Sequence, residues 1–440
     1  MTATDATDAT ETRLVSPPKE AAPLKDGAGP RAERIQPRTL KGFNDYLPEQ
    51  AAKRQWIQER LRHVFERWGY QPLETPALEY ADVLLGRYGA EAEKLIYRFR
   101  DHGGRDVALR YDQTVPFARV VAQYPHLPRP FRRYQFQRVW RGENTGRGRE
   151  REFTQCDVDI AGAAGPVADA ETLAIAAEGF HAIGFQRVQL LVNDRTLFDQ
   201  LGLTKAEVIA IDKLAKIGPD GVVRELVACG RGEQEARDLL RRLQESEPAP
   251  RLREVMAIAR DLGTPDEELR FDPTLARGLE YYTSTVFEVA SPDYTAGSLG
   301  GGGRYDGLIA RFTGRDVPAV GFSFGLERVT EALEEVGAFA GFRAAPVAVA
   351  IPLGLAHLRW AGQVAARLRA AGVSVAISTE PERPLGRQLE AAARLGARYA
   401  LIIGEDEASA GRVTVRDLET REQATLDVEA AAVRLSPAAP

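Results

Sequence analysis

The segment RGLEYYTSTVFE, at residues 277–288, constrains the fold more than any other stretch of the chain. It is rich in β-branched and aromatic residues, which favour β-strands, so we expect a strand here. Because alternate side chains of a strand point to opposite faces, Tyr281 and Tyr282 should not both face the same core. Arg277 stands before them, with no obvious surface helix to decorate. Two interpretations follow: an edge strand with a surface arginine, or the wall of a pocket whose cation binds an anionic ligand.

Similar runs recur around Ile96 and at residues 107–109, 134–140 and 153–160, separated by turns, and they predict a mostly antiparallel sheet. Apolar residues at helical spacing predict helices at 49–67 and 166–183. Between about 200 and 270, Leu- and Ala-rich helical patterns predict a small helical insertion. We therefore expect an α+β domain over residues 36–338, built on a mostly antiparallel sheet.

The chain changes character near both ends. Residues 1–35 are low in complexity and short of apolar side chains, so we expect a disordered tail. Gly, Ala and Pro cluster near 335–346. Beyond them the chain alternates between strand patterns (347–352, 373–379, 399–404) and helix patterns (355–371, 386–396), and then has a hairpin pattern at 412–428. This alternation predicts a second domain over residues 346–435, an α/β unit with a mixed sheet.

Composition and motif content exclude several classes of protein. The net charge of the 440 residues is −5, so a nucleic-acid partner would need a local basic face. No apolar run reaches about 18 residues, so we expect no membrane span. Cys156 and Cys229 cannot form a disulfide framework and fit a reducing compartment, and acidic residues near the N-terminus argue against a signal peptide. The five histidines lack metal-ligand spacing, and no G-x-x-x-x-G-K-[ST] loop is present, which excludes a Walker-type ATP site.

Several stretches, in the right order, resemble the signature motifs of class II aminoacyl-tRNA synthetases. Residues 68–80 (WGYQPLETPALEY) are similar to the first motif, residues 131–160 to the second, and residues 300–329 to the third. Two segments, GFNDYLPEQ at 42–50 and RGLEYYTSTVFE at 277–288, are similar to the opening and to the histidine-binding segment of the histidyl-tRNA synthetase family. The resemblance covers roughly residues 38–435. It implies that residues 36–338 are the catalytic domain and residues 346–435 the anticodon-binding domain.

The resemblance also implies that the reaction uses ATP and Mg²⁺, with ATP bent against the face of the sheet. Arg141 would hold the α-phosphate and Arg328 the γ-phosphate, and Glu143 would contact the adenine side. The implied ATP-binding residues are Arg141, Glu143, Arg149, Arg151 and Arg328. Arg141 and Arg277 would stabilise the charge that builds at the α-phosphate, and no protein-bound metal is implied. Surface arginines are usually solvated, so each of these arginines, taken without the other motifs, would be interpreted as structural rather than catalytic.

The implied histidine-binding residues are Asp112, Gln113, Thr114, Arg141, Gln155, Asp159, Arg277, Tyr281 and Tyr282. A neutral imidazole offers one donor and one acceptor, so a selective pocket must supply the opposite groups. The carboxylates of Asp112 and Asp159 would fix the α-ammonium and the ring N–H. On residue type alone, Asp112 is also a turn residue and Asp159 an exposed strand position. The glycines at 300–303 are either a tight turn or close backbone packing, or a bare strand on which a substrate lies.

Three features depart from the common bacterial pattern of the family. The sequence Tyr111-Asp112-Gln113-Thr114 replaces Pro-Glu-Gly-Thr, and Asp159 replaces Glu. Both look like the eukaryotic and archaeal branch. The loop GENTGRG, at residues 142–148, departs from the wording of either branch.

As a whole, the resemblance implies a cytoplasmic homodimer that activates L-histidine with ATP and transfers it to the 3′ end of tRNA(His). The first motif, with Pro76, usually lies at a dimer interface. Arginines at 383, 387, 394 and 398 would contact phosphates near the anticodon, or else form a solvated helix face. The alternatives are a non-catalytic, histidine-binding regulatory paralogue and a synthetase for another amino acid. The segment at 277–288 argues against both, and the second domain argues against the first.

Overall fold

The computed structural model describes residues 35–85, 95–276 and 281–436. The chain divides into two units, Met1–Thr39 and Leu40–Pro440. Residues 35–39, the described part of the first unit, contain no helix or strand. Arg277 and nearly all of the expected tail lie outside the described residues.

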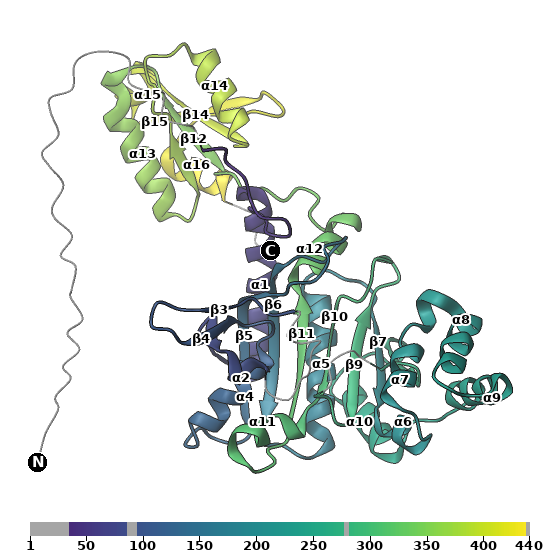
Figure 1. Ribbon diagram of the computed structural model, residues 1–440. Helices are drawn as coiled ribbons and strands as arrows, with labels where there is room; N and C mark the ends of the chain where they lie inside the picture. The colour runs from purple at the N-terminus through teal and green to yellow at the C-terminus, as the bar shows by residue number, and fades with distance from the viewer. Residues whose placement is uncertain (1–34, 86–94, 277–280, 437–440) are drawn as a thin grey trace, which may run out of the picture. The chain divides into compact units, whose positions relative to one another are not determined.

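The larger domain is built on an eight-stranded sheet with the order β1-β5-β6-β11-β10-β9-β7-β8 (Figure 1). The outermost pairs, β1–β5 and β7–β8, are parallel, and every pair between them is antiparallel. The expected mostly antiparallel sheet is therefore confirmed. Its strands are β1 (Gln71–Pro72), β5 (Phe131–Trp140), β6 (Glu152–Ala161), β11 (Ala319–Gly325), β10 (Gly300–Arg304), β9 (Thr285–Ala290), β7 (Gln189–Asp194) and β8 (Leu269–Phe271).

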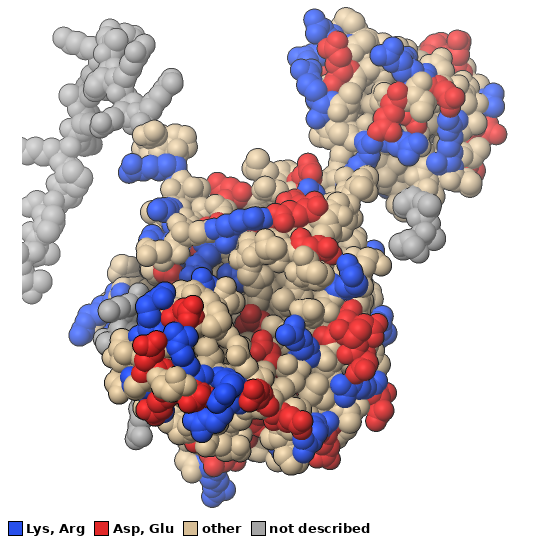
Figure 2. All heavy atoms as spheres, turned by 90° about the vertical axis from the view of Figure 1, so that its right-hand side faces the viewer, with Lys and Arg blue, Asp and Glu red and all other residues tan. Residues whose placement is uncertain are grey.

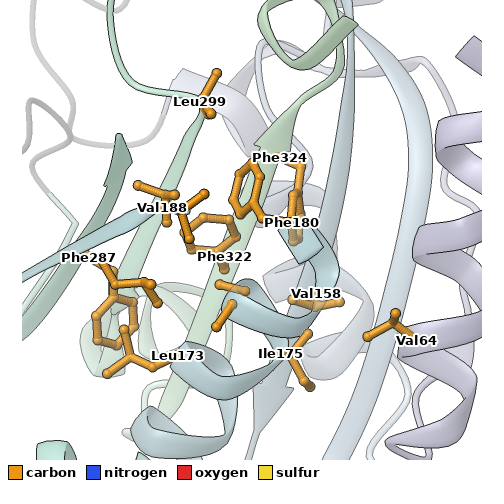
Figure 3. Packing of buried hydrophobic residues seen from close by; sticks show 14 of the residues in the cluster. Val64, Val158, Leu173, Ile175, Phe180, Val188, Phe287, Leu299, Phe322 and Phe324 are labelled. Atoms are coloured by element: carbon orange, nitrogen blue, oxygen red, sulfur yellow. The ribbon is translucent and has the colours of Figure 1, made fainter. Parts of the chain in front are cut away.

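Helices pack against this sheet around one large apolar core. They are α1 (Pro48–Arg67), α5 (Pro166–Ala182), α10 (Pro250–Asp261) and α12 (Leu326–Glu335). The α5 residue Phe180 packs against Phe322 and Phe324 of β11, with ring centroids 6.3 and 4.7 Å apart (Figure 3). Because strand side chains alternate, the residues between these phenylalanines point to the opposite face of the sheet. That face carries the pocket described below.

A second, three-stranded sheet has the order β2-β4-β3. Its strands are β2 (Leu78–Tyr80), β4 (Asp106–Leu109) and β3 (Arg98–Arg100), so the strand expected around Ile96 begins two residues later. Three helices share a second core with this region: α2 (Ala81–Leu85), α4 (Thr114–Gln123) and α11 (Asp306–Thr313).

The helical segment between β7 and β8 has its own small core. This core joins α6 (Thr196–Gln200), α7 (Lys205–Ile211), α8 (Leu214–Ala228) and α9 (Glu233–Gln244). Helix α8 is kinked at Gly218, which has a φ of 69° and is followed by Pro219. Helix α10 packs instead against α5, in the main core, before a short 3₁₀ turn (η1, Asp266–Glu268). The separate helical core is thus formed by α6 to α9 together with Ala276, whereas α10 belongs to the main core.

The C-terminal domain has a mixed five-stranded sheet with the order β13-β12-β14-β15-β16. The strands are β12 (Ala348–Pro352), β13 (Val375–Ile377), β14 (Tyr399–Ile403), β15 (Arg412–Asp417) and β16 (Gln423–Asp427). The helices are η2 (Leu355–His357), α13 (Leu358–Ala370), α14 (Leu385–Arg394), α15 (Glu405–Ala410) and α16 (Val428–Leu435). The expected α/β unit is confirmed, whereas α15 and α16 were not predicted.

The expectation for the two adjacent tyrosines was wrong. Strand β9 begins only at Thr285, and Tyr281 and Tyr282 lie in the turn and extended segment before it. Their side chains are both buried in the same core cluster, with ring centroids 4.8 Å apart. The alternation rule failed because it applies only to regular strand geometry, and these two residues precede it.

Candidate active site

The floor of the pocket is made by alternate residues of β6 and β11. In β6, Cys156 and Val158 belong to the apolar core, whereas Gln155, Asp157 and Asp159 line the pocket. The same alternation in β11 exposes residues 321, 323 and 325 to the pocket. The strand register then places Asp159 between Arg133 of β5 and Gly321 of β11. Polar side chains therefore gather on the sheet face opposite the α5 core.

The pocket encloses about 460 Å³ and brings together most of the residues expected from the sequence. The expected residues that line it are Asp112, Thr114, Arg141, Glu143, Arg149, Gln155, Asp159, Tyr281, Tyr282 and Arg328. Gln113 is buried behind the pocket, where its amide nitrogen donates to the carbonyl oxygens of Gln137 (2.8 Å) and Gln155 (3.0 Å). Arg151 does not line the pocket either, and its Nε donates to the Glu143 carbonyl oxygen at 3.1 Å.

The glycine run at 300–303 forms strand β10 rather than a turn, and three of its residues line the pocket. A Cβ atom on Gly302 would collide with the Gly321 carbonyl, and a Cβ atom on Gly321 would collide with the Asp159 carboxylate. Both sequence interpretations therefore hold in part. The missing side chains allow close packing of the strands and also leave a bare floor on which a ligand could lie.

At one end of the pocket lies a buried cluster of charges. The Arg133 Nη2 atom is 2.7 Å from Oδ2 of Asp159 and 3.8 Å from Oδ2 of Asp157, and the hydroxyl of Tyr305 donates to Asp159. All four side chains are buried. Burial raises the pKa of Asp159 to about 7 against the opposing effect of Arg133, and it also raises the pKa of Asp157. Asp159 is therefore not an exposed strand residue.

Sequence reasoning missed Arg133, Asp157 and Tyr305. The signal for Asp157 was available, because it lies two residues from both Gln155 and Asp159 and so shares their face of a strand. Arg133 and Tyr305 gave no local signal. Arg133 reaches the site because β5 pairs with β6, and Tyr305 reaches it because it directly follows β10.

The sequence allowed two interpretations of Asp112, a turn residue and a carboxylate that binds the ligand. Its Oδ1 accepts a hydrogen bond from the Val115 backbone N–H at 3.1 Å, at the start of α4, as a turn residue would. Its Oδ2 is buried and has no hydrogen-bond partner among the described residues. Burial raises the pKa of this carboxyl to about 6. Asp112 thus holds the local backbone with one oxygen, whereas the other has no hydrogen-bond partner among the described residues.

Arginines also line the pocket. Arg141 is oriented by its Nε, which donates to the Tyr111 carbonyl oxygen at 3.0 Å, and its guanidinium lies 5.0 Å from the centre of the Phe153 ring. Arg328 is held from two sides, since its Nε donates to Gly148 O and its Nη1 to Ser298 O, both at 3.0 Å. Arg149 is half exposed and lies 3.6 Å from Glu143. These fixed cations favour a polyanionic ligand.

A further buried ion pair, which sequence reasoning also missed, lies beside Arg328. Arg54 of α1 pairs with Glu327 at 2.9 Å, and the same Glu327 oxygen accepts the Thr154 backbone N–H of β6 at 3.0 Å. Glu327 directly precedes Arg328. The pair therefore ties the first turn of α12 to α1 and to the floor of the pocket.

The site can therefore bind N–H donors or a cation at its buried carboxylates and phosphates at its arginines. Among the described residues, no group of three or more His, Cys, Asp or Glu side chains could hold a metal ion. The described helices include none long and apolar enough to cross a membrane. A mostly antiparallel sheet with such a pocket between a strand–loop–strand unit (β5–β6) and a strand–helix unit (β11–α12) is the arrangement that the resemblance to class II aminoacyl-tRNA synthetases implies.

Comparison with known proteins identifies the family. Residues 42–329 match the family model described as histidyl-tRNA synthetase, and residues 347–436 match the anticodon binding domain. The histidine–tRNA ligase of Aeropyrum pernix is 41% identical over 86% of this chain and 93% of its own length. That of Gloeobacter violaceus is 37% identical over 88% and 95%. The crystal structure of histidyl-tRNA synthetase from Nostoc sp. PCC 7120 matches with a TM-score of 0.80 and 30% identity, over 91% of this chain and 99% of that one.

This chain belongs to the histidyl-tRNA synthetase family. Its activity is that of a histidine–tRNA ligase, an aminoacyl-tRNA synthetase that uses ATP as a substrate. A non-catalytic regulatory paralogue is not favoured, because the relatives named above are ligases and the anticodon-binding domain is present.

Proposed function

We propose that this pocket of the catalytic domain binds L-histidine at its buried carboxylates and ATP at its arginines. The histidine carboxylate then attacks the α-phosphate, histidyl-adenylate forms, and pyrophosphate leaves. The histidyl group passes in a second step to the 3′ end of tRNA(His). The observation that supports this arrangement is that buried acidic groups and arginines held by backbone carbonyl groups line one cavity of about 460 Å³.

Histidine recognition is assigned to the buried acceptors. The α-ammonium group offers three N–H donors and the neutral imidazole one, and an unmatched buried acceptor costs about 1–3 kcal/mol. Oδ2 of Asp112, which has no partner among the described residues, is suited to an ammonium donor. Asp159, held by Arg133 and Tyr305, is suited to the ring N–H. Thr114, Gln155, Tyr281 and Tyr282 complete the walls.

Catalysis of adenylate formation is assigned to cations at the reacting phosphate. Negative charge grows on the α-phosphate as the carboxylate attacks, so a guanidinium fixed there stabilises the transition state more than the ground state. Arg141 is oriented before any ligand binds. Arg328 would bind the γ-phosphate, and Glu143 and Arg149 the nucleotide beside it. For Arg277, which is outside the described residues, the role rests on the family resemblance alone.

Magnesium would enter the pocket as the counter-ion of ATP. Mg²⁺ keeps most of its waters and needs only one or two carboxylates when phosphates supply other ligands. The described residues form no metal site of their own, which fits an ion that arrives with its substrate.

The remaining expectations concern partners and compartment. We propose that residues 346–435 bind the anticodon region of tRNA(His). Figure 2 shows acidic and basic side chains interspersed on the visible face, so RNA contacts would depend on local clusters. We propose a homodimer through the first motif, where the small sheet exposes Leu78, Tyr80 and Phe99. A cytoplasmic location fits the two free cysteines.

Amino-acid-dependent pyrophosphate exchange, run with each of the twenty amino acids, tests this function without tRNA. Of the twenty amino acids, only histidine should support exchange. Arg141→Ala should lower the rate on the order of 10²–10³-fold. Arg138→Ala is the matched control, because Arg138 lies on the same strand but is exposed and pairs with Glu152 at 3.0 Å. Equal exchange by both variants, or exchange with another amino acid, would contradict the proposal.

A further inference from the structure

The loop between β5 and β6 is fastened to helix α12 by Arg147. The Arg147 guanidinium pairs with Glu331 and Glu335 and lies 5.6 Å from the centre of the Tyr294 ring. The Tyr294 hydroxyl in turn donates to Glu331 Oε2 at 3.1 Å. We name this group of side chains, Arg147, Tyr294, Glu331 and Glu335, the loop clasp. It involves the segment GENTGRG, whose sequence departs from both branches of the family.

The loop clasp grips the same face of α12 that carries Arg328. Glu331 and Glu335 follow Arg328 by three and seven residues, which places all three side chains on one stripe of the helix. Gly148, the residue after Arg147, accepts a hydrogen bond from Arg328 Nε at 3.0 Å. Fixing Arg147 therefore fixes the carbonyl group that orients Arg328.

The approach of the loop to Arg328 is too close for an ordinary side chain at Gly148. A Cβ atom on Gly148 would lie 2.8 Å from Arg328 Cγ, and the φ of Gly148 is 60°. On its other side, Arg328 donates to the Ser298 carbonyl, in the loop that also carries Tyr294. Two loops thus hold the guanidinium, and the loop clasp joins both of them to α12.

We propose that Arg147 is a positioning residue, which holds the β5–β6 loop on α12 so that Arg328 is aligned before ATP binds. The inference rests on the proposed contact of Arg328 with the γ-phosphate. A cation that is already aligned binds a phosphate without first losing side-chain and loop entropy. Without the clasp, that ordering cost is paid when ATP binds, so the KM for ATP rises. Arg328 is not among the residues assigned to histidine, so the KM for histidine should not change.

The expected effect is moderate because the clasp is partly exposed. Exposed ion pairs contribute little singly, but two pairs and a cation–π contact act together here. We expect Arg147→Gln to raise the KM for ATP about 5- to 30-fold. The double variant Glu331→Gln/Glu335→Gln should have the same effect, and Arg147→Lys, which keeps the charge but not the planar fork, a smaller one.

The test measures KM for ATP and KM for histidine by pyrophosphate exchange on the full-length protein, without tRNA. Arg237→Gln is the matched control, because its side chain is 48% exposed, against 55% for Arg147, and also pairs with two carboxylates, both at 3.1 Å. Arg328→Ala is measured beside them to test the underlying assignment. A selective rise in the KM for ATP in Arg147→Gln, absent from Arg237→Gln, supports the proposal.

Three results would overturn it. If Arg328→Ala raises the KM for ATP and Arg147→Gln behaves like Arg237→Gln, the clasp does not position Arg328 and the proposed function stands. If Arg147→Gln raises both KM values equally, Arg147 has only a general structural role. If Arg328→Ala leaves the KM for ATP unchanged, the ATP contact itself is wrong and the inference falls with it.

Discussion

Replacing Arg133 by methionine should destabilise the catalytic domain and should do so more at high pH than at low pH. Arg133 is fully buried, and its guanidinium lies between Asp157 and Asp159 and 4.8 Å from the centre of the Phe117 ring. Methionine fills a similar volume and keeps the apolar contact, but it leaves two buried carboxylates without their shared cation.

The size of the effect follows from the distances. With an effective dielectric constant of about 20, the attraction between Arg133 and Asp159, at 2.7 Å, is about 6 kcal/mol. The attraction between Arg133 and Asp157, at 3.8 Å, is about 4 kcal/mol. Most of this gross attraction is offset by the cost of burying the guanidinium. Removing one partner of a buried ion pair typically costs about 3–5 kcal/mol, and we expect a loss of this size in the free energy of unfolding at about pH 8.

The pH dependence follows from the direction of the pKa shift. Asp159 has a pKa of about 7 in the folded protein, against about 4 in an unfolded chain. Because the folded value is higher, the folded protein binds more protons between these two values, and this carboxyl makes folding less favourable as the pH rises through that range. Without Arg133 its folded pKa should rise further. At low pH the Asp159 carboxyl of the variant is protonated and no longer needs a cation. The loss in the free energy of unfolding should therefore be about 1–2 kcal/mol smaller at pH 6 than at pH 8.

Urea unfolding at pH 6 and pH 8, monitored by circular dichroism, measures the loss in the free energy of unfolding and its change with pH. Arg138→Met is the control, since its exposed pair with Glu152 should contribute less than about 1 kcal/mol. The variant Asp159→Asn should remove most of the pH-dependent part of the Arg133→Met effect. A loss below about 1 kcal/mol, or one that does not change with pH, would refute the idea that Arg133 balances two buried carboxylates.

Three further predictions follow from the arrangement of the chain. Arg277→Ala should lower pyrophosphate exchange on the order of 10²–10³-fold without unfolding the protein, and a drop of less than about tenfold would remove Arg277 from catalysis. Deleting residues 1–35 should leave histidine activation unchanged, because this segment is low in complexity and lies outside every motif; a slower exchange rate would show that the tail contributes to it. Removing residues 340–440 should weaken tRNA charging far more than histidine activation, because every group assigned to histidine or ATP precedes residue 340. Both activities are compared at low and moderate salt, with oligomeric state measured in parallel, and equal losses in an unchanged oligomer would argue against a dedicated RNA-binding domain.

The sequence by itself determined the elements and much of the site. Helix periodicity located α1 and α5 almost to the residue, and the β-branched and aromatic runs located β5 and β6. Family motifs indicated Asp112 and Asp159, whose carboxylates the structure places in one pocket. These features depend on residues close together in the chain, so a local pattern carries them.

The tertiary structure alone decided which distant residues meet. Asp159 is balanced by Arg133 and crowded by Gly321 only because β6 pairs with β5 on one side and β11 on the other. Arg54 reaches Glu327 across 273 residues, and Arg147 reaches Glu331 across 184. Tyr281 and Tyr282 share one core because the chain enters β9 later than its composition suggests. Strand order, register and the start of a strand are set by packing of the whole sheet, and no local stretch of sequence contains that information.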